Sequence, residues 1–192
     1  IALHGMIQLI GNGTRTFVFK DAIKKNIISN YFYGSLIGLS FSGLIVFFLI
    51  QSFDVKTANE ISFDYLKPLI GIYILWFLYL RKKQPAKLFN FFYVGIIGGL
   101  TSIFIGAVGP LIAPFFLNDK LTKENIIANK AACQIITHLG KIPLFIYFFD
   151  LNYFAHATLL IPLMLAVYIG THIGKKQLGY IPERTFKMIF KI

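Results

Sequence analysis

A long apolar stretch in the second half of the sequence, residues 126–149, carries several polar side chains: Asn129, Lys130, Gln134, His138 and Lys141. Gln134, His138 and Lys141 are spaced by four and then three residues, which places them on one face of a helix. A cation at the centre of a bilayer costs about 2.5–3.5 kcal/mol on insertion scales, so it usually has a function or a partner. Lys141 could face the path of an anion, or it could extend to the interface or pair with another helix. His138 could be a hydrogen-bonded structural residue, a proton carrier or a donor to a substrate.

A related pattern occurs near the start of the chain. Gln8, Asn12 and Arg15 again place an amide, a second polar group and a cation on one helix face. A long apolar segment begins a short distance after the cation in each case. The amides could simply bond across helices, and Arg15 could extend to a nearby basic loop. We interpret the two patterns as an internal repeat, with halves at residues 1–80 and 81–192.

A break containing glycine and proline interrupts the apolar run from residue 88 to residue 117. Gly106, Gly109 and Pro110 lie at this break, where proline removes a backbone donor and glycine weakens a helix. Non-helical backbone at membrane depth persists only where it faces protein or a water-filled cavity. The backbone N–H groups at such helix ends attract anions. We therefore predict a broken or re-entrant helix whose backbone at Gly106 and Gly109 contacts an anion.

The groups on these helix faces are hydrogen-bond donors. Amides, imidazole, cations and backbone N–H groups suit a small oxyanion, whereas a cation carrier would need carboxylates or a cage of carbonyl groups at depth. The Asp and Glu residues lie almost entirely in the polar segments between apolar runs. The four His have no paired metal-ligand spacing, so we expect neither a metal nor a cofactor. Ser40 and Ser42 have no His and Asp at a recognisable spacing, which argues against an enzyme.

The composition places these residues in a membrane protein. Of the 192 residues, 56% are apolar and only 14% are charged, and the mean hydropathy is +0.68. Soluble domains are usually about half apolar and about a quarter charged, so the solvent here is a lipid bilayer. The net charge of +11 comes from short basic clusters between apolar runs, which is typical of cytoplasmic loops rather than of nucleic-acid binding. The expected membrane segments are residues 26–50, 63–80, 88–117, 126–149 and 154–173.

The basic clusters also order these segments across the membrane. Residues 20–25, residues 81–87 and the lysines of the C-terminal tail should face the cytoplasm. All three clusters meet this rule if residues 88–117 enter the membrane and return to the side of entry. Residues 1–15 and 126–149 then run in opposite directions, as in inverted-topology repeats, whose substrate site lies near the midplane. The sequence thus predicts an all-α, multi-pass protein of the cytoplasmic membrane, and it leaves a homo-oligomer and proton coupling open.

Three longer motifs combine these features. They are a glycine-rich helix break, the helix that follows it and a first-half counterpart of that helix: Gly95-x2-Gly98-Gly99 with Gly106-x2-Gly109-Pro110-x3-Pro114-Phe115-Phe116-Leu117, then Ala131-x2-Gln134-x3-His138-x2-Lys141, and His4-x3-Gln8-x3-Asn12-x2-Arg15. Together they resemble the TauE/SafE sulfite exporter family, also called the toluene-sulfonate uptake permeases. The resemblance covers most of the chain and departs from the family pattern at Asn12-Gly13.

This resemblance implies an inner-membrane permease for sulfite or a small organosulfonate, with the candidate residues above in contact with the anion. It also implies that a glycine-rich element before residue 1 and a last helix are missing, so we expect a fragment. Alternating access between two repeats would be the mechanism. Two other interpretations are an anion channel lined by the same donors and a structural membrane subunit. A structural subunit would have no need of a buried Lys141 beside a helix break.

Overall fold

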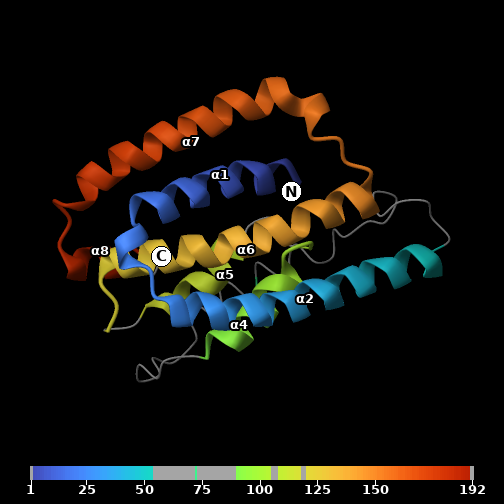
Figure 1. Ribbon diagram of the computed structural model, residues 1–192, viewed down its shortest axis with the longest axis horizontal. Coiled ribbons are helices and arrows are strands. Elements are labelled where there is room, and N and C mark those ends of the chain that lie inside the picture. Colours follow the sequence, from blue (N-terminus) through green and yellow to red (C-terminus); the bar gives the residue numbers. More distant parts are fainter. Residues whose placement is uncertain (1, 54–71, 73–89, 105–107, 118–119, 191–192) are drawn as a thin grey trace.

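The computed structural model describes residues 2–53, 72, 90–104, 108–117 and 120–190, and every regular element within them is helical (Figure 1). This confirms the predicted all-α class. The α-helices are α1 (Ala2–Val18), α2 (Lys25–Ser52), α4 (Phe91–Thr101), α5 (Val108–Ile112), α6 (Lys123–Phe149), α7 (Ala157–Leu178) and α8 (Glu183–Ile189). Short 3-10 helices lie at Lys20–Ala22, Ala113–Phe116 and Phe154–His156.

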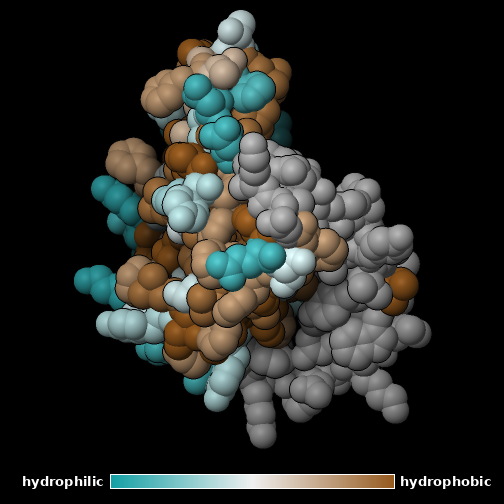
Figure 2. Space-filling model, turned by 90° about the vertical axis from the view of Figure 1, so that its right-hand side faces the viewer, coloured by the Kyte–Doolittle hydropathy of each residue, from teal (hydrophilic) through white to brown (hydrophobic). Residues whose placement is uncertain are grey.

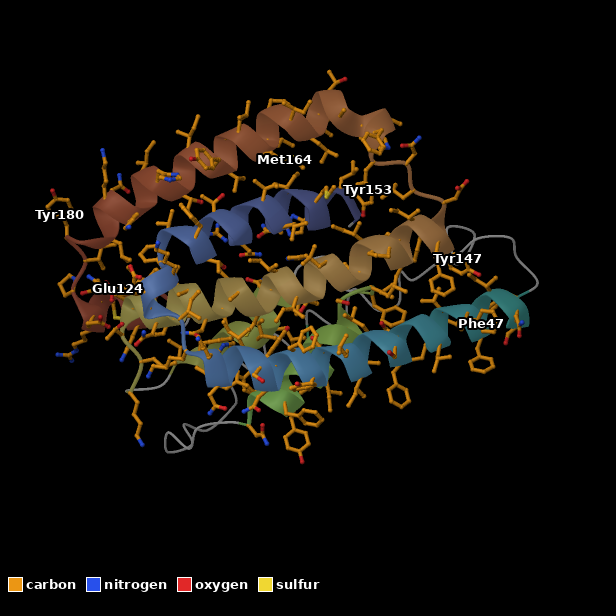
Figure 3. All side chains as sticks on the ribbon, in the orientation of Figure 1. Phe47, Glu124, Tyr147, Tyr153, Met164 and Tyr180 are labelled. Carbon is orange, nitrogen blue, oxygen red and sulfur yellow. The ribbon has the colours of Figure 1, made fainter. Side chains whose placement is uncertain are left out.

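Three segments of the described chain are long and apolar enough to cross a membrane: Lys25–Ser52, Lys123–Phe149 and Phe154–Leu178. At a rise of about 1.5 Å per residue, each exceeds a hydrocarbon core of about 30 Å. Phe47 on α2 points away from the neighbouring helices (Figure 3), and apolar side chains cover much of the described part of one face (Figure 2). The chain is therefore a multi-pass membrane protein. The predicted span at residues 63–80 lies, apart from Ile72, outside the described residues.

Glycines bring α2 and α4 into direct backbone contact. Gly34 and Gly38 on α2 face the backbone of α4, and the small-x3-small spacing is one that packs helices within membranes. In return, Gly95 and Gly99 on α4 face the backbone of α2. A Cβ on Gly99 would stand 2.5 Å from the carbonyl oxygen of Ser35, so a larger residue would separate the two helices. Successive contacts advance along both helices in the same direction, so α2 and α4 are parallel.

The segment after α4 turns back toward the end at which α4 begins. Phe91 opens α4 and Phe116 follows α5, yet their ring centroids are only 4.9 Å apart. Ile103, just after α4, packs instead with Val46 and Phe145 near the far ends of α2 and α6. This segment therefore enters and returns on one side, as the re-entrant interpretation predicts.

Helix α6 runs parallel to α2 and antiparallel to α1 (Figure 1). On the α2 side, the hydroxyl groups of Tyr31 and Thr137 share a buried hydrogen bond of 2.8 Å. On the α1 side, Gly5 lies against Lys141. The opposite directions of α1 and α6 are those that the inverted repeat requires, while the division of the chain into two halves stays a prediction.

Several helix boundaries differ from the sequence prediction, among them the start of α6 and the end of α7. Helix α6 begins at Lys123, three residues earlier than predicted, because Thr122 and Asn125 form a capping box in which each side chain accepts the other's backbone N–H. Helix α7 continues beyond its predicted end at residue 173 to Leu178. Its last turn carries basic side chains, which interact favourably with the C-terminal end of a helix dipole.

Candidate functional site

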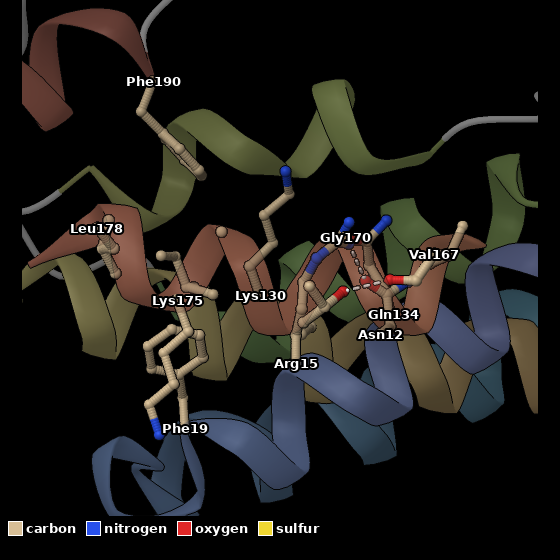
Figure 4. Close-up of a pocket in the computed structure, with 14 residues that line it drawn as sticks. Asn12, Arg15, Phe19, Lys130, Gln134, Val167, Gly170, Lys175, Leu178 and Phe190 are labelled. Atoms are coloured by element: carbon tan, nitrogen blue, oxygen red, sulfur yellow. Dashed lines mark hydrogen bonds between the residues drawn. The ribbon is translucent and has the colours of Figure 1, made fainter. Parts of the chain in front are cut away.

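A cavity of about 540 Å³ lies between α1, α6 and α7 (Figure 4). Its polar lining consists of two amides, a threonine and three cations: Asn12, Gln134, Thr171, Arg15, Lys130 and Lys175. Apolar side chains, among them Phe19, Val167 and Phe190, line much of the rest. No Asp or Glu of the described chain lines this cavity, so its electrostatic potential is positive. We call it the basic cavity.

Arg15 and Asn12 form the α1 side of the basic cavity. Arg15 donates from Nη1 to Asn12 Oδ1 at 3.1 Å, and both side chains lie beside Gln134 (Figure 4). Asn12 is fully buried, and its Nδ2 has no hydrogen-bond partner among the described residues. An unmatched buried donor costs about 1–3 kcal/mol. An anion within reach of Nδ2 would remove that cost.

The two lysines of the basic cavity contact aromatic rings. Lys130 Nζ lies 4.9 Å from the ring centroid of Phe190, and Lys175 Nζ lies 5.6 Å from that of Phe19. Lys175 also donates to the carbonyl oxygen of Val18 at 2.9 Å. A cation–π contact contributes about 0.5–1 kcal/mol at exposed sites, whereas a hydrogen bond to a charged group contributes about 1.5–3 kcal/mol. The ammonium group of Lys130, which contacts only the ring of Phe190 in this comparison, can therefore exchange a neutral partner for an anion at a gain.

Beyond the basic cavity, α6 and α1 carry a deeper group of bases. Lys141 is 0% exposed and His138 is 1% exposed, and His4 of α1 interacts electrostatically with both. A Cβ on Gly5 would stand 2.8 Å from Lys141 Cε, so the glycine makes room for the lysine stem. Neither ring nitrogen of His138 has a hydrogen-bond partner in the described part of the chain. We call His4, His138 and Lys141 the inner basic cluster.

Gln134 stands between the basic cavity and the inner basic cluster. It lines the cavity, and it precedes His138 by one helical turn. From the α5 side, a Cβ on Gly109 would stand 2.9 Å from Gln134 Nε2, so the missing side chain allows α5 to approach this amide. Two of the predicted site residues, Gly109 and Gln134, therefore lie together. Gly106 lies outside the described residues.

The structure separates the remaining predicted residues into two depths. Asn12, Arg15 and Gln134 line the basic cavity, whereas His138 and Lys141 belong to the inner basic cluster and do not line it. Gln8 is half-buried on α1 and does not line the cavity either. Among the described residues, no group of three His, Cys, Asp or Glu comes together in a way that could hold a metal ion. The contribution of each residue to anion contact stays a prediction.

The residues of the basic cavity that sequence reasoning missed include Lys130, Lys175 and Phe190. Lys130 lies four residues before Gln134, on the helix face already identified, so its spacing could have revealed it. Lys175 belongs by sequence to the basic tail, and only the packing of α7 against α1 brings it to the cavity. No sequence pattern places Phe190 over Lys130.

Comparison with known proteins identifies the family of the chain. The searches of curated proteins and of solved structures returned no match. The family model described as Sulfite exporter TauE/SafE matches residues 5–192, a range that contains every predicted site residue. This multi-pass membrane chain therefore belongs to the TauE/SafE sulfite exporter family, whose members are transporters.

Proposed function

We propose that this protein moves sulfite or a small organosulfonate across the cytoplasmic membrane by alternating access. The observation that carries the proposal is the basic cavity, which presents three cations and two amides without an acidic lining residue from the described chain. A sulfite or sulfonate group has three oxygens arranged as a pyramid, and several convergent donors can bind them at once. Arginine offers paired N–H groups to such an anion, and lysine offers a mobile point charge.

The two depths of the site support a carrier rather than an open channel. Lys175 at the basic cavity is exposed, so the cavity can receive an anion from one side. His138 and Lys141, farther along α6, are almost completely buried. The positive-inside rule assigns the end with Lys175 to the cytoplasm. We therefore assign this conformation to the inward-facing state, in which Gln134 connects the open cavity to closed interior groups.

Transport in sealed proteoliposomes tests this proposal. The reconstituted chain should take up radiolabelled sulfite with a rate that saturates, and unlabelled sulfite or sulfonates should block it, whereas chloride and phosphate should not. Lys141→Met keeps the length of the buried side chain but removes its charge, and we expect it to abolish uptake while the protein stays folded in detergent. Absence of sulfite and sulfonate uptake under both a pH gradient and a voltage gradient would contradict the proposal. A rate that rises without saturation would favour the anion channel.

A further inference from the structure

One aromatic ring in the wall of the basic cavity lies over a cation. The ring centroid of Phe190, the residue after α8, is 4.9 Å from Lys130 Nζ, and both residues line the cavity (Figure 4). Lys130 is half-buried, so its ammonium group is within reach of a molecule that enters the cavity. The π face of a ring and an anion both attract an ammonium group. A neutral ring therefore occupies a position at Lys130 that an anion could take.

Contacts at both ends of α8 hold this ring in place. Glu183, the first residue of α8, accepts the backbone N–H of Lys123 at 3.0 Å, and Lys123 Nζ donates to the carbonyl oxygen of Ile181 at 2.7 Å. At the other end, the rings of Phe186 and Phe190 stack with their centroids 5.4 Å apart. Both rings also pack against the buried apolar core. The fold therefore positions the Phe190 ring at the cavity wall.

The ring lies where like charges approach one another. Arg15 on α1 interacts electrostatically with Lys130, and Lys175 is a third cation of the cavity lining. No carboxylate from the described chain joins them in this lining. Without an anion the cations repel each other, and the ring stabilises Lys130 alone. A bound oxyanion would stabilise Lys130 and Arg15 together through charge-assisted hydrogen bonds, so the anion is the stronger partner.

We propose that Phe190 is an aromatic gate of the basic cavity: its ring holds the Lys130 ammonium group while the cavity is empty and yields it to an incoming anion. The side chain turns aside when the anion binds and returns when the anion leaves. Because ring and anion compete for one cation, the ring lowers the affinity of the cavity and eases release of the anion on this side. This inference rests on the proposed anion transport and adds a residue that sets the affinity of its site.

Equilibrium binding of radiolabelled sulfite to the detergent-solubilised full chain tests the competition. Phe190→Leu removes the π face and should lower the Kd for sulfite roughly two- to fivefold, the factor equivalent to a cation–π contact at an exposed site. Phe190→Trp presents a stronger π face and should raise the Kd. Ile189→Leu, at an exposed position that does not line the cavity, is the control and should match the wild type. An unchanged or higher Kd in Phe190→Leu would overturn the proposal.

The same substitution in a Lys130→Met background separates the gate from a simple effect of side-chain volume. Without the ammonium group, ring and anion no longer compete for a shared partner. Lys130→Met alone and Lys130→Met combined with Phe190→Leu should therefore have equal Kd values for sulfite. If Phe190→Leu lowers the Kd by the same factor in both backgrounds, the ring acts through volume and the gate is refuted.

A measurement that needs no anion covers a chain that fails to bind sulfite. The sequence has a single tryptophan, Trp76, so Phe190→Trp combined with Trp76→Phe places the only indole at the gate. Since a nearby charge alters indole fluorescence, adding Lys130→Met should shift the emission, whereas Lys176→Met, an exposed control outside the cavity, should not. Equal emission with and without Lys130→Met would overturn the gate. A normal shift in a protein whose liposomes do not move sulfite would contradict the transport function instead.

Discussion

Replacing Lys130 by Met should weaken anion capture while leaving the bundle intact. Methionine has a similar length and can still pack on Phe190, so the substitution chiefly removes one of three cations around the basic cavity. A hydrogen bond to a charged group contributes about 1.5–3 kcal/mol. Lys130 is half-buried in a cavity that reaches water at Lys175, and Arg15 remains, so part of this energy is screened or replaced.

These considerations give a loss of about 1–2 kcal/mol, which corresponds to a rise in KM for sulfite of roughly 5–30-fold with little change in the maximal rate. Initial uptake rates in proteoliposomes, measured over a range of sulfite concentrations, would give both parameters. Lys176→Met is the matched control, because Lys176 is exposed on α7 and does not line the cavity. Its KM should equal that of the wild type.

Two results would refute the reasoning. Equal KM values for Lys130→Met and Lys176→Met would mean that the charge at Lys130 does not contribute to capture. A fall in the maximal rate at unchanged KM would place Lys130 in a later step of the cycle. In either case the basic cavity would lose its assignment as the site of anion entry.

Three further predictions concern the scaffold. Gly99→Leu should lower the stability of the protein in a thermal unfolding experiment in detergent, by about 1–3 kcal/mol or more, because the new side chain overpacks against the α2 backbone. Gly170→Leu should not lower it, because a Cβ at Gly170 would meet nothing within 4 Å. Glu183→Gln should make the C-terminal segment more sensitive to protease, because the carboxylate accepts the backbone N–H of Lys123 at 3.0 Å and its charge contributes about 0.3–1 kcal/mol at a helix N-terminus. Tyr31→Phe should cost about 1 kcal/mol of unfolding free energy in a denaturant titration, since it deletes a buried hydrogen bond.

The shared helix face of Gln134, His138 and Lys141 was predictable from their spacing alone. The four- and three-residue steps from Gln134 to Lys141 placed the polar groups on one face of α6, and the structure buries that face. The glycine–proline pattern likewise indicated a segment that returns, which the contact of Phe91 with Phe116 bears out. These features depend on a single helix or hairpin, so local periodicity is sufficient to predict them.

The other residues of the basic cavity depend on which helices pack together, and periodicity within one helix carries no such information. Lys175 reaches the cavity only because α7 lies along α1, and Phe190 only because α8 folds back beside α6. The start of α6 is a different case, since its capping residues Thr122 and Asn125 are visible in the sequence. The charged Lys123 and Glu124 made that turn look like part of a polar loop.

The backbone contact between α2 and α4 has a mechanical consequence. At Gly34, Gly38, Gly95 and Gly99 the two backbones touch directly. No side chain at these contacts can change rotamer to let the helices slide past one another by small adjustments. The re-entrant hairpin and α2 should therefore move as one stiff block. Around α1, by contrast, the contacts with α6 and α7 involve longer side chains such as Lys141 and Val167. Any rocking that exposes the anion to the opposite side should occur at the interface of α1 with α6 and α7, which is also where the basic cavity lies.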